Sequence, residues 1–154
     1  MAKEGNSRMA EIYALEGDAS TWEEALKVTA DELLARGCVR PDFYESCVER
    51  EREYPTGLTN ACPVAIPHTT KDHVVREAIA VLRLRRPVEF ACIEDASLRV
   101  RVRYVFNLAL CDSSAHLDLI RHLIGSVKDP GFFRRLDDLP LEDLRGFLAG
   151  KFFD

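Results

Sequence analysis

Apolar residues recur at helical spacing in two stretches of the first third of the chain, which predicts two helices there. The first stripe consists of Trp22, Leu26, Ala30 and Leu33. A capping box of the form S-x-x-E, Ser20 to Glu23, precedes it, and Gly37 follows as a suitable C-terminal stop. Pro41 suits the first turn of the second helix. That helix has a shorter stripe, continued one turn later by two charged residues: Phe43/Tyr44, Cys47/Val48, then Arg50 and Glu51.

Strand patterns occupy the middle of the chain, after a short possible strand at residues 11–15. A small apolar run, 64–67, ends in a proline and predicts a short buried strand. Residues 77–90 and 98–110 predict two longer strands. The second of these begins as strict alternation of apolar residues with arginine and ends almost entirely apolar, as expected for a strand that passes from an exposed edge into the core.

Three further helices are predicted in the C-terminal third. The first begins near Ser113 and has Leu117, Ile120, Leu123/Ile124 and Val127 as its inner stripe. The segments 129–136 and 140–150 predict two short closing helices. Because helices and strands interleave along the chain, we expect an α/β layered fold with a mixed β-sheet flanked by helices.

Composition indicates one free-standing domain. The 154 residues are 47% hydrophobic and carry a formal net charge of −5 at pH 7, and the length matches the usual size of a single globular domain. The negative charge argues against nucleic-acid binding, which favours a basic surface. No apolar stretch approaches the ~18 residues of a membrane span, and the N-terminus lacks the apolar core of a signal peptide. We therefore expect a cytoplasmic protein without direct membrane insertion.

The cysteines and histidines do not predict a metal site. The five cysteines are odd in number and form no C-x-x-C pair, so we expect reduced thiols. His116 and His122 are six residues apart in a predicted helix, roughly 240° around its axis, and therefore face different ways. His68 and His73 flank one loop, but no nearby carboxylate pattern completes a ligand set.

His68 is the first candidate for chemistry because it directly follows Pro67 at the end of the predicted short strand. Proline fixes a backbone angle and removes a donor, so the next side chain is held in place. A neutral imidazole is nucleophilic. A solvated loop histidine is the competing interpretation, and the position alone leaves both open.

Two other side chains are candidates for contacting negative charge. His116 lies in the first turn of the helix predicted to begin near Ser113, where free N–H groups favour anions and help to keep a histidine neutral. Arg50 offers a planar guanidinium that suits an oxyanion. The alternatives are a partly buried histidine at the core edge and an arginine whose stem covers apolar surface. The arginines between positions 83 and 103 are interpreted as the solvated faces of two strands rather than as an anion patch.

Three motifs follow one another in a recognisable order: Arg50-Glu51, the turn Thr56-Gly57-Leu58, and Val64-Ala65-Ile66-Pro67-His68. The later segments AIAVLRLRRPVEF and VFNLALCDSSAHLDLIRHL continue the pattern in register. From about Thr21 to the C-terminus, the sequence resembles the enzyme IIA component of the sugar phosphotransferase system, fructose/mannitol class. The segments YPTGL and AHLDLIRHL are most similar to the galactitol-like branch of that family.

The resemblance implies one enzyme IIA domain over residues 1–154, with residues 1–10 flexible and the family's mixed-sheet fold. It implies that His68 accepts a phosphoryl group from the histidine-containing phosphocarrier protein and passes it to a cysteine of an enzyme IIB component, for uptake of a galactitol-like sugar. His116 and Arg50 match the residues that stabilise the phosphoryl group, and the scheme requires no cofactor or metal. The alternative is a regulatory member whose phosphorylated form binds a target protein instead of feeding a transporter.

The sequence departs from the family pattern close to His68. Thr69 stands where the family usually has Gly, Ala or Cys. Ala61-Cys62-Pro63 replaces a Gly-rich lead into the strand, and Asn60 takes a usually apolar place. Because these residues border His68, they bear on the choice of donor and acceptor proteins more than on phosphorylation itself.

Overall fold

The structure is a computed structural model that describes the backbone of residues 10–59, 61–111 and 113–153, and the side chains of these residues except 113–116. The expected flexibility of residues 1–10 falls, for residues 1–9, outside the described residues. Ala10 is described and is buried at the edge of the core.

A five-stranded mixed sheet forms the centre of the molecule, in the order β1-β4-β5-β3-β2. The strands are β1 (Glu11–Gly17), β2 (Gly57–Leu58), β3 (Val64–Ala65), β4 (Ala78–Ala91) and β5 (Arg99–Ala109). β1 pairs in parallel with β4, and β3 pairs in parallel with β5. The pairs β4–β5 and β2–β3 are antiparallel. The two long strands therefore form the middle of the sheet, and β3 carries the chain toward His68 along the flank of β5.

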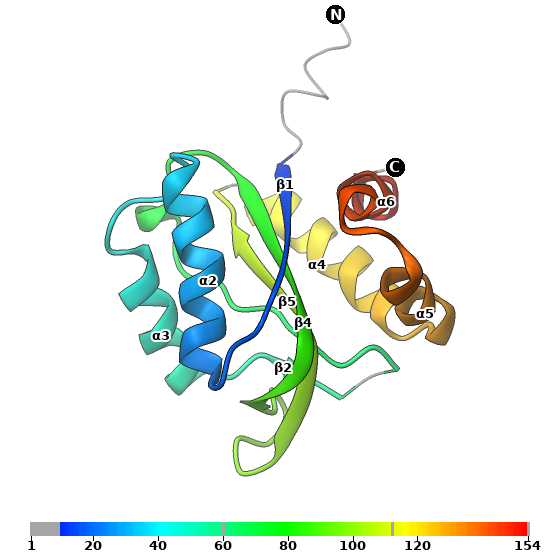
Figure 1. Cartoon of the computed structure of the whole chain (residues 1–154). Helices are drawn as coiled ribbons and strands as arrows, with labels where there is room; N and C mark the ends of the chain where they lie inside the picture. Colours follow the sequence, from blue (N-terminus) through cyan, green and yellow to red (C-terminus); the bar gives the residue numbers. More distant parts are fainter. Residues whose placement is uncertain (1–9, 60, 112, 154) are drawn as a thin grey trace, which may run out of the picture.

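Helices cover both faces of this sheet (Figure 1). One layer contains α2 (Trp22–Ala35) and α3 (Phe43–Glu53). The other contains α4 (Ser113–Val127), α5 (Pro130–Asp138) and α6 (Leu141–Phe153). A 3-10 turn, η1 (Lys71–His73), follows β3. The predicted architecture, a mixed sheet flanked by helices, is confirmed. Among the described helices, none combines the length and the apolar character needed to cross a membrane.

The first helix begins one residue later than its predicted capping box. Thr21 is the N-cap, and its hydroxyl accepts the backbone N–H of Glu24 at 3.2 Å. The Glu24 carboxylate accepts the N–H of Ser20 at 2.8 Å in return. The prediction of Ser20 to Glu23 is wrong because the sequence contains two overlapping motifs of the same form. Gly37, at φ +74°, ends the helix as predicted.

Two details of the other helices also differ from the prediction. Pro41 lies before α3, whose N-cap is Asp42, and not in its first turn. In α4, Leu117 is 58% exposed, whereas Leu119 is 4% exposed. The buried stripe of this helix is Leu119, Leu123 and Val127. α4 therefore packs along a row of residues four apart, and the prediction of an inward Leu117 is wrong.

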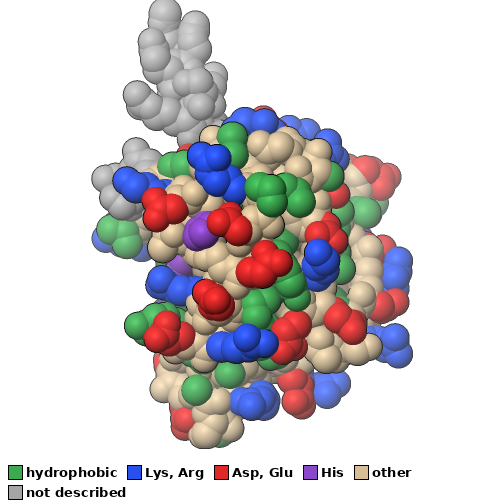
Figure 2. All heavy atoms as spheres, turned by 90° about the vertical axis from the view of Figure 1, so that its left-hand side faces the viewer, with side chains coloured by type: hydrophobic (Ala, Val, Ile, Leu, Met, Phe, Trp, Pro, Cys, Tyr) green, Lys and Arg blue, Asp and Glu red, His purple; other side chains and the backbone are tan. Residues whose placement is uncertain are grey.

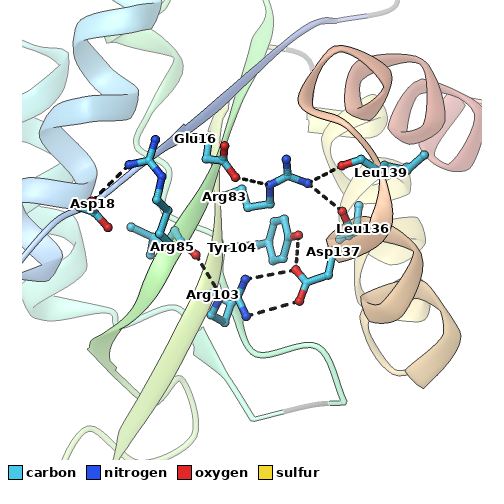
Figure 3. A network of polar contacts seen from close by, with 10 residues as sticks. Glu16, Asp18, Arg83, Arg85, Arg103, Tyr104, Leu136, Asp137 and Leu139 are labelled. Atoms are coloured by element: carbon cyan, nitrogen blue, oxygen red, sulfur yellow. Dashed lines mark hydrogen bonds and ion pairs between the residues drawn. The ribbon is translucent and has the colours of Figure 1, made fainter.

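Arg83 in β4 is buried, contrary to its prediction as part of a solvated face. It is 8% exposed, and its guanidinium donates to Glu16 at 3.0 Å. It also donates to the backbone carbonyls of Leu136 and Leu139, at 3.0 and 2.8 Å (Figure 3). These carbonyls belong to the C-terminal end of α5 and the residue that caps it, where unpaired acceptors attract a cation. Arg83 thus ties the sheet to the C-terminal helices.

A second arginine, Arg103, also joins the sheet to α5. Arg103 in β5 pairs with Asp137 at 3.2 Å, and the Tyr104 hydroxyl donates to the same carboxylate at 2.6 Å (Figure 3). Burial and the neighbouring Asp137 carboxylate raise the pKa of Tyr104. The hydroxyl therefore stays protonated and remains a donor to α5.

Candidate functional site

His68 lies just past the end of β3, beside the central strand β5. β3 ends at Ala65, two residues earlier than predicted, but the chain stays alongside β5. His68 forms an isolated parallel bridge with Leu108, whose N–H donates to the Pro67 carbonyl at 3.0 Å. Pro67 is buried and His68 is half-buried. The imidazole is therefore carried by backbone that is anchored to the sheet.

The imidazole of His68 is also anchored by its own ring. Nδ1 lies 3.0 Å from the backbone carbonyl oxygen of Ile66. A carbonyl oxygen can only accept, so Nδ1 carries the proton of this hydrogen bond. In the neutral ring the lone pair then resides on Nε2. If His68 acts as a nucleophile, this arrangement makes Nε2 the attacking atom.

α3 runs beside this turn and places Arg50 on the helix face that contacts it. The hydroxyls of Ser46 and Thr69 are hydrogen-bonded, which fixes α3 against the residue that follows His68. Ser46 and Arg50 are four residues apart and therefore share one face of the helix. Arg50 therefore lies on the same face of α3 as Ser46, the residue that contacts the turn after His68, and its role at the site stays a prediction.

The Arg50 side chain retains an unused donor. Its guanidinium stacks over the Tyr54 ring, 4.9 Å from the centroid. Its Nε atom is buried and has no hydrogen-bond partner among the described residues. A buried donor without a partner is unfavourable, so such groups usually mark a place where a ligand or water completes the bonding. A guanidinium N–H is well suited to an anionic oxygen.

Glu51, the next residue in α3, is 5% exposed and accepts hydrogen bonds from two donors of Thr56. Its carboxylate accepts the Thr56 N–H at 2.7 Å and the Thr56 hydroxyl at 3.0 Å. Burial raises the pKa of Glu51 to about 7, and the hydrogen bonds from Thr56 oppose that rise. The sequence analysis named Glu51 and Thr56 only as parts of motifs and assigned neither a role at the site.

Two of the residues near His68 that differ from the family pattern, Thr69 and Cys62, form hydrogen bonds in the structure. Thr69 is 7% exposed, and its hydroxyl is satisfied by the hydroxyl of Ser46. Cys62 is fully buried, and its N–H donates to the carbonyl of Val127 at 3.0 Å, at the end of α4. The segment that replaces the Gly-rich lead is therefore pinned to α4. Asn60 lies outside the described residues.

The third predicted site residue, His116, is described by the structure only in its backbone. It lies in α4, which begins at Ser113, five residues after Leu108 in β5. Since Leu108 bridges His68, the N-terminus of α4 follows the strand position that flanks the candidate nucleophile. The side chain of His116 lies outside the described residues, so its proposed contact with a phosphoryl group stays a prediction.

The surface over α2 and α3 is mixed in charge. Figure 2 shows lysine, arginine, aspartate and glutamate side chains interspersed on this face, with histidine side chains reaching the surface. The face drawn in Figure 2 therefore shows no broad basic area. Among the described residues, no group of histidine, cysteine or carboxylate side chains is arranged to hold a metal ion.

The sequence matches a known protein family and is similar to a characterised relative. The family model for "Phosphoenolpyruvate-dependent sugar phosphotransferase system, EIIA 2" matches residues 10–143. The galactitol-specific EIIA component of Escherichia coli (strain K12) is 30% identical over 132 residues, which cover 85% of this chain and 87% of that protein.

Solved structures agree with the family model. The crystal structure of IIA mannitol from Escherichia coli matches with a TM-score of 0.71 and 26% identity, over 90% of this chain and 96% of that one. A complex of enzyme IIAMTL with phosphorylated enzyme IIBMTL, from the same organism, matches with a TM-score of 0.72 and 26% identity. That match covers 91% of this chain and 94% of the other.

Proposed function

Because the chain belongs to the EIIA 2 family of the phosphoenolpyruvate-dependent sugar phosphotransferase system, we propose that it carries a phosphoryl group on His68. Membership of the family confirms the resemblance seen in the motifs and makes the chain a phosphotransferase component of the sugar phosphotransferase system. The observation that carries the assignment to His68 is its ring geometry. The Nδ1–H donates to Ile66, so the lone pair sits on Nε2 of an imidazole whose backbone bridges the central strand β5.

Each of the two proposed steps forms one bond to phosphorus and breaks another. In the first, His68 Nε2 attacks the phosphohistidine of the histidine-containing phosphocarrier protein, a new N–P bond forms, and the donor's N–P bond breaks. In the second, a cysteine thiolate of an enzyme IIB component attacks the same phosphorus, and the Nε2–P bond breaks. The imidazole that leaves takes back its lone pair and returns to the neutral ring.

Arg50 and His116 are proposed to stabilise the phosphoryl group during both steps. Phosphoryl transfer depends on positioning and on neutralising charge on the equatorial oxygens. Arg50 offers the Nε donor that has no partner among the described residues. His116, near the N-terminus of α4, is proposed to donate a second hydrogen bond. The scheme uses only side chains of this protein and its two partners.

Two relatives support the remaining parts of the proposal. An Escherichia coli mannitol enzyme IIA with a similar structure forms a complex with phosphorylated enzyme IIB, which supports an enzyme IIB partner here. The 30% identity to a galactitol-specific component supports a galactitol-like sugar as the substrate of the whole transport system. We place this exchange in the cytoplasm, where the phosphocarrier protein would meet both partners.

The proposal is tested by reconstitution. The chain is incubated with phosphoenolpyruvate, enzyme I and the phosphocarrier protein, and then with a candidate enzyme IIB. We expect about one phosphoryl group per chain, followed by its loss to enzyme IIB. Absence of labelling would refute the carrier role. Labelling without transfer to any cognate enzyme IIB would favour the regulatory alternative.

Arg50→Lys is expected to slow phosphoryl transfer by about 10–100-fold without unfolding the protein. Lysine keeps the positive charge but loses the planar set of donors that includes Nε. Single-turnover transfer from the phosphocarrier protein measures the effect. Arg52→Lys is the matched control, because Arg52 is exposed on the same helix and stacks on Trp22 instead. An unchanged rate in Arg50→Lys would make Arg50 a surface residue, and a large fall in melting temperature would make it structural.

A further inference from the structure

A continuous chain of hydrogen bonds joins the interior of α3 to the ring of His68. The Thr56 hydroxyl donates to the buried Glu51 carboxylate at 3.0 Å. The same hydroxyl oxygen accepts the N–H of Ile66 at 3.1 Å. The carbonyl of Ile66 then accepts the Nδ1–H of His68 at 3.0 Å. Both backbone polar groups of Ile66 are therefore occupied, one by Thr56 and one by the imidazole.

We propose that Glu51 and Thr56 are positioning residues that hold His68 in the Nδ1–H tautomer and aim its Nε2 at the phosphoryl donor. Neither residue touches the reacting atoms, and both act through the backbone of Ile66. The kinetic part of this inference rests on the proposed function. The structural part concerns only the ring of His68 and stands without it.

The burial of Glu51 indicates that this arrangement has a role beyond packing. A carboxylate in the interior is unfavourable unless it is well hydrogen-bonded. All the hydrogen bonds that the structure gives Glu51 come from the N–H and the hydroxyl of Thr56. Arg52 and Arg99 line the same hollow as Glu51. Among the described residues, neither arginine forms an ion pair with the Glu51 carboxylate. Glu51 therefore serves to orient Thr56.

The position of Thr56 is also fixed from its other side. Gly57 follows it in β2, and a Cβ atom at this position would lie only 2.7 Å from the carbonyl oxygen of Ala91. The chain thus passes in close contact with the end of β4, which only glycine allows. With Glu51 on one side and β4 on the other, the Thr56 hydroxyl has a defined direction toward Ile66.

The critical comparison is Thr56→Val against Thr56→Ser. Valine keeps the shape of threonine but removes the hydroxyl, so the Ile66 N–H loses its acceptor and the carbonyl that holds His68 is released. Serine keeps the hydroxyl. We expect the ring ¹⁵N chemical shifts of His68 in Thr56→Val to move from the Nδ1–H pattern toward averaged tautomers, and those in Thr56→Ser to stay unchanged.

Kinetics provide the second readout. Thr56→Val should lower the single-turnover rate of phosphoryl transfer by about 10–100-fold, the range expected when a reacting group is misplaced by about 1 Å. KM for the phosphocarrier protein should stay unchanged, because Thr56 is only 3% exposed and offers almost no surface to a partner. Thr56→Ser should restore the rate to within about twofold of the wild type, which loss of packing alone does not predict.

Glu51→Gln separates charge from hydrogen bonding. The amide oxygen of glutamine can still accept from Thr56, so we expect wild-type ¹⁵N shifts and a near-normal rate. Glu51→Leu removes the acceptor and should behave like Thr56→Val. It also replaces Thr56→Val as the decisive variant if that protein does not fold. Thr21→Ala, which removes the cap of α2, controls for lost stability far from the site.

The outcomes distinguish this inference from the function on which it builds. If Thr56→Val or Glu51→Leu leaves the ¹⁵N shifts of His68 unchanged, the positioning role is wrong. If Thr21→Ala shifts them equally, the effect is general destabilisation and the inference is again overturned. If the wild-type chain accepts no phosphate, the proposed function fails, while the ¹⁵N shifts still decide whether Thr56 fixes the ring.

Discussion

Alanine at position 68 is expected to abolish phosphorylation of the chain completely. The His68→Ala variant lacks the imidazole whose Nε2 lone pair is proposed to attack phosphorus, and no neighbouring group replaces it in the scheme. The measurement is incorporation of label from phosphoenolpyruvate through the phosphocarrier protein. In the wild type the label should be acid-labile and alkali-stable, as a phosphoramidate is.

The matched control is another histidine of the same chain. His122→Ala removes an exposed imidazole from α4 and should be labelled at the wild-type rate. His73, which pairs with Asp42 at 2.9 Å, offers a second control with a structural contact. If His68→Ala incorporates label at the normal rate, phosphate is carried elsewhere and the assignment of His68 is wrong.

A graded loss of activity is expected for His116, in the order wild type, His116→Gln, His116→Ala. The glutamine amide is a donor and partly replaces the imidazole N–H, whereas alanine has no donor. We expect His116→Ala to transfer phosphate to enzyme IIB about 10²–10³-fold more slowly, the usual effect of losing one oxyanion donor. Single-turnover transfer from the phosphorylated chain measures all three proteins.

The same series separates chemistry from packing. If His116 only fills the edge of the core, His116→Gln should change the free energy of unfolding by about 1 kcal/mol and leave the transfer rate alone. His68 should still accept phosphate slowly in His116→Ala, and the variant should melt near the wild-type temperature. Equal transfer rates across the series would remove His116 from the site.

The sheet was readable from the sequence because its strands have clear boundaries. β4 and β5 are long, and the arginine alternation at the start of β5 shows which side chains face outward. The run ending in Pro67 correctly predicted a short strand next to His68. The histidine at the strand end and the proline before it made His68 a candidate, and only the resemblance to the enzyme IIA family favoured a phosphorylated histidine over a solvated loop histidine.

Features that depend on contacts between distant elements were not readable. Arg83 looks like one more solvated arginine until the end of α5 supplies carbonyl acceptors for it. Leu117 and Leu119 are equally apolar, and only the packing of α4 on the sheet decides that Leu119 is buried. Glu51 appears as a charged residue at a helix end, and its contact with Thr56 exists only in the folded chain.

The buried carboxyl of Glu51 also couples folding to proton uptake. Burial raises its pKa from an ordinary value of 4.5 to about 7, so between these two pH values the folded chain binds more protons than the unfolded chain. The contribution to stability is complete below about pH 4.5 and is lost as the pH rises through 7. Most paired carboxylates act in the opposite direction, because their pKa falls on folding. Mild acidification therefore strengthens the part of the fold that holds the turn before His68.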